Sequence, residues 1–471
     1  MRKNKNQYQG LNHNNPNASS NLVQTFAITS DPQFPWTDNT DRDIPEDNAT
    51  KERRSEELIR EQYNSINEYM NSLSSNVNGN VIINGDMTAF GHGSEWTKID
   101  SLIGILNRPY YFGLGNHDIE NNFNNCVNNG CFKNSLNNLV GHIRRHGLLS
   151  QFDFSEQDIV TSWGLGARRQ GSFAYFVNLG NLCFIQLQHN PTMNKIASPT
   201  STNTQEYRVF PNINWVENQL RRAKDNGQII IVNVHVRGNI PNDYEQLLQN
   251  YGVTAVFSGH IHTSLGTNRC VGNIPAFISG SASQRTYLIL EQYTDRLEIY
   301  TVRNNDWRNR ELVRTIPIST QLPIFSGRYQ IVTALNDSSV LDLNNMGNPN
   351  NVTLWSNNSG NNQKWDFNLN GPTQAYSIRS VSNPNLVLAW NDYQNSRNVF
   401  ATPFISGHDE HLWVLERGDI GFIFRNGKNR NLVLDVQNGN TSNGTNIQVH
   451  ERHSVGSPYR RAQEFQLRKM N

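Results

Sequence analysis

The chain has 471 residues, too many for one compact core, so we expect more than one domain. Its 41 basic and 40 acidic side chains leave a formal charge of +1, which argues against nucleic-acid binding driven by charge. No stretch approaches the ~20 consecutive apolar residues of a membrane-spanning helix, so no transmembrane segment is expected.

Residues 1–20 are polar and rich in Asn. Lys3 and Lys5 precede no apolar segment, so this start does not have the pattern of a standard secretory signal. We expect a disordered polar arm over residues 1–20. The compartment stays open, and release from the cell by another route remains an alternative.

Strand and helix patterns alternate between residues 22 and 113. Strands are expected at Leu22–Thr29, Val81–Asn84 and Tyr110–Gly113, and helices at Glu52–Leu73 and Trp96–Leu106. In the first helix, apolar side chains recur every three or four residues from Ile59 to Leu73 and form one stripe for the core. Parallel strands joined by helices have right-handed crossovers, so these strand ends should emerge on one edge of a sheet.

Two cysteines and two histidines lie close together in the sequence between residues 126 and 146. Cys126 and Cys131 flank an Asn-Asn-Gly turn, which favours a local disulfide, with a pair of free thiols as the alternative. Metal binding is not expected at this spacing. His142 and His146 stand four apart on an expected helix with two arginines between them, which indicates a solvated face rather than a metal site.

A second sheet is expected to begin with a hairpin at Ala174–Leu179 and Leu182–Gln188. We interpret His189, at its end, as a turn residue, with an outer-shell or substrate-binding role as the alternative. Helices at Trp215–Lys224 and Tyr244–Asn250 then alternate with strands at Gln228–Val234 and Thr254–Phe257. The four strands expected between residues 276 and 318 should complete this second sheet.

Five of the apolar, strand-like segments end in polar residues that are able to bind a metal ion. In chain order these ends are Asp31-Pro32-Gln33, Gly85-Asp86, Gly115-Asn116-His117-Asp118, Val234-His235 and Gly259-His260-Ile261-His262. A lone Gly-Asp after a strand is more often a turn, but five such ends on one sheet edge predict a metal centre. Carboxylate, amide and imidazole ligands suit Mn²⁺, Fe²⁺ or Zn²⁺.

In this order the five motifs resemble those of the calcineurin-like metallophosphoesterases, over roughly residues 22–318. The resemblance implies a two-sheet αββα sandwich that holds two divalent ions. It implies that Asp31, Gln33, Asp86 and His262 hold one ion, and that Asp86, Asn116, His235 and His260 hold the other. Most of the family has His where this chain has Gln33, so the first ion would have a weaker ligand.

The resemblance also implies hydrolysis of phosphate monoesters or diesters. Two ions about 3.5 to 4 Å apart generate a hydroxide and stabilise the attacking and leaving oxygens. His117 would protonate the leaving group, and Asp118 would orient His117. We therefore expect a phosphoesterase domain over residues 21–318.

From Gly327 onward the pattern changes to short strands and Asn/Gly turns that repeat three times. The repeat markers are Leu341-Asp342-Leu343, Leu388-Ala389-Trp390 and Leu434-Asp435-Val436, each followed by an aromatic at Trp365, Trp413 or Phe465. Three self-similar units that cannot each bury their own face must close on one core, and these aromatics should lie in it. The pattern resembles the ricin B-type lectins, a β-trefoil, so we expect a linker at 319–326 and an all-β trefoil domain at 327–471.

Sugar binding in that family uses an acid, an aromatic platform and an Asn-Gln pair in each repeat. The first repeat keeps the full set in Asp342, Trp355, Asn362 and Gln363. The acid would accept from sugar hydroxyls and the indole would stack on a sugar face. A galactose-type or related glycan is the expected ligand, and a trefoil that only braces the enzyme or docks a protein is the alternative.

The other repeats lack parts of the set. The second has Ala389 in place of the acid, and the third keeps Asp435 but offers His450 and Ala462 at the platform and Asn positions. We therefore expect glycan binding through the first repeat alone.

Together these patterns predict an α/β protein, an αββα sandwich followed by an all-β trefoil. The expected function is a dinuclear metal-dependent phosphoester hydrolase that a lectin domain targets to glycans. The alternative is a carbohydrate-binding or toxin-like protein with a weakly active or inactive phosphoesterase scaffold. Gln33 favours that alternative, whereas the otherwise complete ligand set favours the enzyme.

Overall fold

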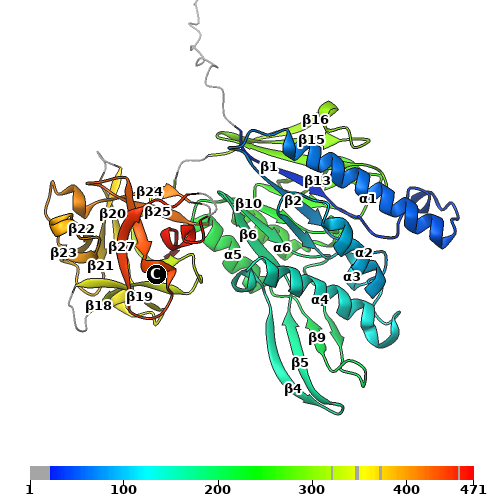
Figure 1. Cartoon of the computed structure of the whole chain (residues 1–471), viewed down its shortest axis with the longest axis horizontal. Helices are drawn as coiled ribbons and strands as arrows, with labels where there is room; N and C mark the ends of the chain where they lie inside the picture. The colour runs from blue at the N-terminus through cyan, green and yellow to red at the C-terminus, as the bar shows by residue number, and fades with distance from the viewer. Residues whose placement is uncertain are drawn as a thin grey trace, which may run out of the picture.

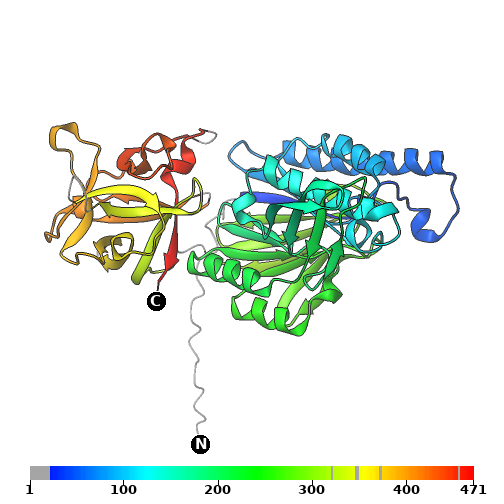
Figure 2. The ribbon, with the colours of Figure 1, turned by 90° about the horizontal axis from the view of Figure 1, so that it is seen from below.

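The computed structural model describes residues 22–319, 322–344, 350–370, 374–418, 420–454 and 457–470, so the expected arm at 1–20 lies outside the described residues. Two units lie side by side, one with helices packed on sheets and one built of strands (Figures 1 and 2). Among the described helices, none combines the length and the apolar character needed to cross a membrane.

The first sheet begins with the expected parallel strands. Its order is β16-β15-β14-β1-β2-β3. The strands are β1 (Leu22–Thr29), β2 (Asn78–Asn84), β3 (Tyr110–Gly113), β14 (Tyr287–Tyr293), β15 (Arg296–Val302) and β16 (Glu311–Pro317). Helices α1 (Asn48–Asn71) and α2 (Gly93–Ile103) connect β1 to β2 and β2 to β3. The expected stripe of α1 is confirmed, since Ile59, Tyr63 and Ile66 are all buried.

The second sheet faces the first and has the order β12-β13-β11-β10-β7-β6. Its strands are β6 (Tyr175–Leu179), β7 (Leu182–Gln186), β10 (Ile229–Asn233), β11 (Ala255–Ser258), β12 (Leu265–Val271) and β13 (Ile274–Ser279). Helices α5 (Ile213–Asp225) and α6 (Asn242–Asn250) cover its outer face, with a hydrophobic cluster between them. A larger cluster joins both sheets to α1, α2 and α4 (Gly130–Arg145). The αββα prediction is therefore confirmed.

The prediction that the strands after residue 276 complete the second sheet is wrong for three of the four. Only β13 joins that sheet. β14 pairs antiparallel with β1, so β14, β15 and β16 extend the first sheet. The apolar pattern of these strands predicts burial but does not specify the strand with which they pair. β2 occupies one edge of β1, so the other edge is open to β14.

The expected solvated face of α4 is wrong for His142. Its ring is buried and packs against Tyr110 and Phe112, with centroids 5.4 and 4.5 Å away. Burial lowers the pKa of His142 well below its usual range, so the ring packs as a neutral aromatic. Arg144 and Arg145 are exposed, so their charges mark a different face of the same helix.

A third, small sheet was not predicted from the sequence. Its order is β4-β5-β9-β8, with β4 (Ser155–Thr161), β5 (Gly164–Gly171), β8 (Lys195–Ala197) and β9 (Glu206–Val209). Figure 1 shows β4 and β5 as a hairpin that projects away from both large sheets.

The C-terminal unit is all β, as predicted. Its strands are β17 (Gly327–Thr333), β18 (Ser339–Asn344), β19 (Asn351–Ser356), β20 (Trp365–Asn370), β21 (Ala375–Ser380), β22 (Leu386–Trp390), β23 (Val399–Pro403), β24 (Trp413–Arg417), β25 (Phe422–Asn426), β26 (Leu432–Val436), β27 (Thr445–Glu451) and β28 (Phe465–Lys469). β17 pairs with β28, which joins the first and last strands of this unit. Trp365, Trp413 and Phe465 are fully buried in one cluster, which confirms the shared core of the three repeats.

Polar contacts join the two units where α5 meets the trefoil. The Arg222 guanidinium donates to the Asp337 carboxylate at 2.7 Å and to Gln466 at 2.7 Å. Arg417 donates to the backbone carbonyls of Asn226 and Gly227, just past the C-terminus of α5, at 2.6 and 2.9 Å. A cation at that end of a helix interacts favourably with the helix dipole.

Candidate metal centre and glycan site

All seven expected ligands lie at the carboxyl ends of strands, where the two sheets face each other. Asp31 and Gln33 follow β1, Asp86 follows β2, and Asn116 opens the short helix α3 (Asn116–Ile119) after β3. His235 follows β10, and His260 and His262 follow β11. Four of these residues turn the chain with positive φ: Asp31, Gln33, Asp86 and His260. Such costly backbone conformations cluster at functional sites.

The ligand atoms meet across the gap between the sheets. His235 Nε2 lies 2.9 Å from Asp86 Oδ2 and 3.8 Å from Asp31 Oδ1. His262 Nε2 lies 3.3 Å from the same Asp31 oxygen. The ligand atoms of Asp86, His235 and His260 all lie within 4.8 Å of one another. One cavity on this edge is lined by Trp36, Asp41, Asp86, His117, His260 and His262.

Several of these buried atoms have no hydrogen-bond donor. They are Asp31 Oδ1, Gln33 Oε1, Asp86 Oδ2, Asn116 Oδ1 and His235 Nε2. The His235 Nδ1 lies 2.8 Å from the Asn84 carbonyl, so in the neutral ring Nδ1 donates and Nε2 presents a lone pair to two carboxylates. Buried acceptors that face one another are costly unless a cation lies between them. The residues therefore fit a divalent ion.

The electrostatics of the site agree with this fit. Burial lowers the pKa of His235, but the Asp86 and Asp31 carboxylates outweigh it and raise that pKa to about 9. Burial likewise opposes protonation of His262, yet the nearby Asp31 and Asp41 carboxylates raise its pKa to about 10. Both rings thus experience a strongly negative local potential, which a bound cation would neutralise.

Asp41 supports the site, although the sequence motifs do not include it. Its Oδ1 lies 2.6 Å from His262 Nδ1 and accepts from Trp36 Nε1 at 2.7 Å. Its Oδ2 accepts from Ser283 and Gln284. A carboxylate on the far nitrogen of a metal-binding His fixes the ring and its tautomer. No local pattern identifies Asp41 as part of the site, because His262, Ser283 and Gln284 come from distant segments.

The expected role of Asp118 is wrong. Its buried carboxylate accepts from the backbone nitrogens of Met87, Thr88 and Gly115, so it ties the loop after β2 to the start of α3. Burial and the Asp86 charge raise its pKa to about 7. As the third residue of α3, Asp118 turns back over the helix N-terminus and is not bonded to His117.

His117 is positioned by other groups. Its backbone N–H donates to Asp86 Oδ1 at 2.8 Å, and its ring Nδ1 lies 2.9 Å from the Ala89 carbonyl. The ring lines the cavity and packs edge-on against Trp36, with centroids 5.3 Å apart. When Nδ1 donates to that carbonyl, Nε2 is the nitrogen left for chemistry in the cavity.

His189 is buried, which favours the outer-shell alternative over a simple turn. Its Nε2 lies 2.8 Å from a Glu120 carboxylate oxygen. Burial lowers its pKa to about 4, and it interacts electrostatically with Asp86 and His235. His189 therefore belongs to the surroundings of the candidate ligands.

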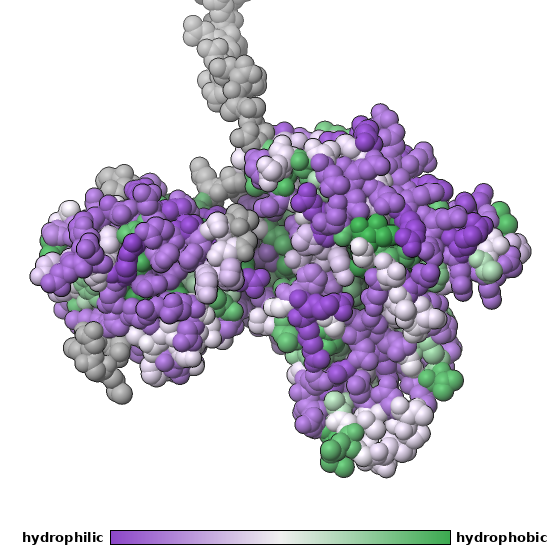
Figure 3. All heavy atoms as spheres, viewed as in Figure 1, coloured by the Kyte–Doolittle hydropathy of each residue, from purple (hydrophilic) through white to green (hydrophobic). Residues whose placement is uncertain are grey.

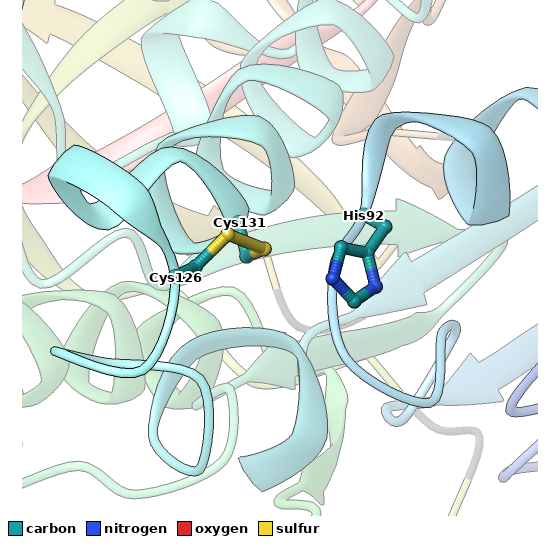
Figure 4. Close-up of side chains that lie close together, drawn as sticks. All are labelled: His92, Cys126 and Cys131. Carbon is teal, nitrogen blue, oxygen red and sulfur yellow. A yellow bond between two sulfur atoms is a disulfide. The ribbon is translucent and has the colours of Figure 1, made fainter.

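A second His/Cys group lies apart from the strand ends. Figure 4 shows the His92 ring beside Cys126 and Cys131. The possible ligand atoms of these three residues lie within 4.8 Å of one another. The two cysteines form a disulfide, which confirms the preferred prediction. Bridged sulfurs are not thiolates, so His92 is the one conventional ligand in the group and we assign no ion to it.

The four expected glycan residues gather on the β18–β19 hairpin and the turn before β20. Asp342 Oδ2 accepts from Asn362 Nδ2 and from Gln363 Nε2, both at 2.9 Å. Trp355 stands two residues beyond Thr353, the cross-strand partner of Asp342, so it shares the face of Asp342. Its side chain is 39% exposed, enough to offer a ring face.

The third repeat differs from the first. Gln448 donates to Asp435 at 2.9 Å, and a cavity of about 280 Å³ beside Asp435 is lined by His450, His453 and Tyr459. His450 is a poor platform by itself, but His453 and Tyr459 add two further aromatic rings that the sequence pattern does not predict.

Comparisons with known proteins cover both units. A family model for calcineurin-like phosphoesterases matches residues 24–264, and one for ricin-type beta-trefoil lectin domain-like sequences matches residues 361–450. Pierisin of Pieris brassicae is 29% identical over 125 residues, 26% of this chain and 14% of pierisin. The main hemagglutinin component type C of Clostridium botulinum C phage is 38% identical over 85 residues, 18% of this chain and 29% of that protein. The chain thus spans less than a third of these curated relatives.

Two solved structures are similar to the trefoil part. The designed three-fold symmetric protein ThreeFoil is 24% identical with a TM-score of 0.26, covering 31% of this chain and 99% of that one. The Macrolepiota procera ricin B-like lectin, in complex with lactose, is 24% identical with a TM-score of 0.25, covering 31% and 97%. The family model for calcineurin-like phosphoesterases matches more than half of the residues of this chain, so the chain belongs to the calcineurin-like phosphoesterase family.

Proposed function

We propose that this protein is a dinuclear metal-dependent phosphoester hydrolase that its trefoil holds at glycan-bearing surfaces. The domain limits we propose are 21–318 for the hydrolase and 327–471 for the lectin. The observation that carries the proposal is the set of buried acceptors without donors between Asp31, Asp86 and His235. Such a set is costly to maintain in a scaffold that binds no cation.

The residues divide into two proposed ligand sets that share Asp86. Asp31, Gln33, Asp86 and His262 would hold one ion, and Asp86, Asn116, His235 and His260 the other. Bound divalent ions would supply Lewis acidity and a hydroxide near neutral pH. No side chain is needed as a covalent nucleophile.

The side chains of the cavity orient groups and move a proton. His117 Nε2, with Nδ1 at the Ala89 carbonyl, is placed to give a proton to the leaving-group oxygen. Asp41 holds the His262 ring in one orientation, and the Asn84 carbonyl does the same for His235. Asp118 keeps the loop after β2 next to α3, so Asp86 and Asn116 stay together.

The experiment is a panel of aryl phosphate monoesters and diesters, run on protein reconstituted with Mn²⁺, Fe²⁺ or Zn²⁺. We expect close to two bound ions per chain and hydrolysis of at least one ester class, lost on chelation and restored by metal. A protein that binds both ions and hydrolyses no ester would favour the toxin-like scaffold alternative instead.

A further inference from the structure

The projecting β4–β5 hairpin ends in exposed apolar side chains. Val160, Trp163 and Leu165 are 84%, 53% and 80% exposed. Val160 and Leu165 are cross-strand partners, and Trp163 lies in the two-residue turn between the strands. Figure 3 shows the resulting hydrophobic patch at the far end of the projection. We call residues 159–167 the hairpin tip.

The base of the hairpin is fixed, whereas the tip has no packing partner in the described chain. β5 pairs with β9 from Arg168 to Gly171, and a Cβ on Gly166 would meet the Thr204 carbonyl oxygen at 2.1 Å. Beyond Gly166 the two strands pair only with each other. The apolar side chains of the tip therefore contribute nothing to the core, and water contact with them is unfavourable.

The charges around the tip have a distinct arrangement. No residue from 159 to 167 is charged. At the base, Glu156 binds both Arg144 and Arg169, and Glu206 binds both Arg168 and Arg208. Each carboxylate thus neutralises one of its two guanidinium groups, and the exposed Asp158 beside the tip offsets one of the two remaining charges. These groups leave a net charge of +1 behind an uncharged tip.

The shape and size of the tip favour a lipid surface over a protein partner. Three large side chains at these exposures present on the order of 400 Å². A stable protein interface needs about 800 Å² from each partner, arranged in complementary shapes. A bilayer accepts a convex tip of this size without a pocket of complementary shape. Trp favours the membrane interface, and cations set back from the tip favour anionic headgroups.

We propose that the hairpin tip docks this protein on lipid bilayers, with Val160, Trp163 and Leu165 inserted at the headgroup level. The hairpin attaches to α4 through Arg144 and Glu156. α4 packs against α3, which carries His117, so α4 connects the hairpin to the candidate centre. The proposal does not depend on phosphoester hydrolysis, because it is tested by binding alone.

The test uses the full chain and vesicles without glycolipid, so that the trefoil has no glycan to bind. One set is phosphatidylcholine and the other contains phosphatidylserine as well. The variants are the double change Val160→Ser with Leu165→Ser, and the control Val127→Ser, a side chain 85% exposed outside the hairpin. We expect the double variant to lose about tenfold or more of its vesicle partitioning and the control to keep it.

A second measurement reports how deeply Trp163 inserts into the bilayer. With brominated lipids, bound wild type should show tryptophan quenching, and Trp163→Phe should bind similarly with most of the quenching lost. The proposal is overturned if wild type binds neither vesicle, or if the control loses as much binding as the double variant. It is also overturned if the double variant changes the oligomeric state and not vesicle binding, because the tip is then a contact between copies.

Discussion

The candidate metal centre and the first-repeat glycan site both contain buried carboxylates, but the two differ in hydrogen bonding. At the metal centre, Asp86 Oδ2 and Asp31 Oδ1 lack donors. In the trefoil, Asp342 Oδ2 accepts two amide donors at 2.9 Å. A cation binds strongly enough to offset the cost of ligand atoms that have no hydrogen bond before the ion binds. A sugar hydroxyl competes with water, so it needs an acceptor that is already oriented.

This difference predicts unequal responses to mutation. A ligand at the metal centre acts as part of one ionic cluster, so its loss affects the whole cluster. A residue at the glycan site makes one modest contact among several. The following predictions test that contrast.

The largest effect is expected for His235→Ala. The change removes the lone pair that faces both Asp31 and Asp86, so hydrolysis should fall by about 1,000-fold or more with the fold retained. Ester turnover, metal content and circular dichroism measure these three properties. Glycan binding by the same variant should be unchanged, and a variant that keeps its turnover would remove His235 from the proposed ligands.

Asp41→Asn should have the next largest effect. An amide holds the His262 ring less firmly than a carboxylate, so affinity for one of the two ions should fall about 10- to 100-fold. Titration with metal separates this loss from a loss of turnover at saturating metal. The matched control is Asp43→Asn in the same cavity, which has no hydrogen bond to His262 among those of the described residues. Equal losses in both variants would show a general charge effect.

Gln33→His should strengthen metal binding. Both polar atoms of the Gln33 side chain are buried without partners, and imidazole is a better donor to borderline ions than an amide oxygen. We expect the weaker ion to bind about tenfold more tightly, as measured by metal titration. Superimposable titration curves for the two proteins would mean that residue 33 does not contact an ion.

The smallest effect is expected for Trp355→Ala. Loss of one stacking contact should weaken glycan binding about five- to tenfold on an array or by calorimetry. Asp435→Ala is the control in the third repeat and should change little. If Asp435→Ala weakens binding more, the glycan lies in the third-repeat cavity beside His453 and Tyr459.

The sequence predicted the strand-end convergence because each ligand follows its own apolar segment, and that pattern is local. It also predicted the trefoil core, because Trp365, Trp413 and Phe465 recur at fixed positions in the repeats. What it missed depends on contacts between distant segments. Asp41 reaches His262 across 221 residues, and β14 reaches β1 across the whole domain. The sequence does not predict the partners of Asp118, because backbone donors carry no sequence signal.

The contacts of Arg222 and Arg417 restrict the motion of the trefoil relative to the phosphoesterase unit. They hold the trefoil against α5 in addition to the covalent connection between the two units. A trefoil bound to a glycan would then set the hydrolytic cavity at a fixed height and angle above the glycan-bearing surface. The proposed enzyme would then cleave esters at one distance from the sugar, and it would not cleave esters that are nearer or farther away.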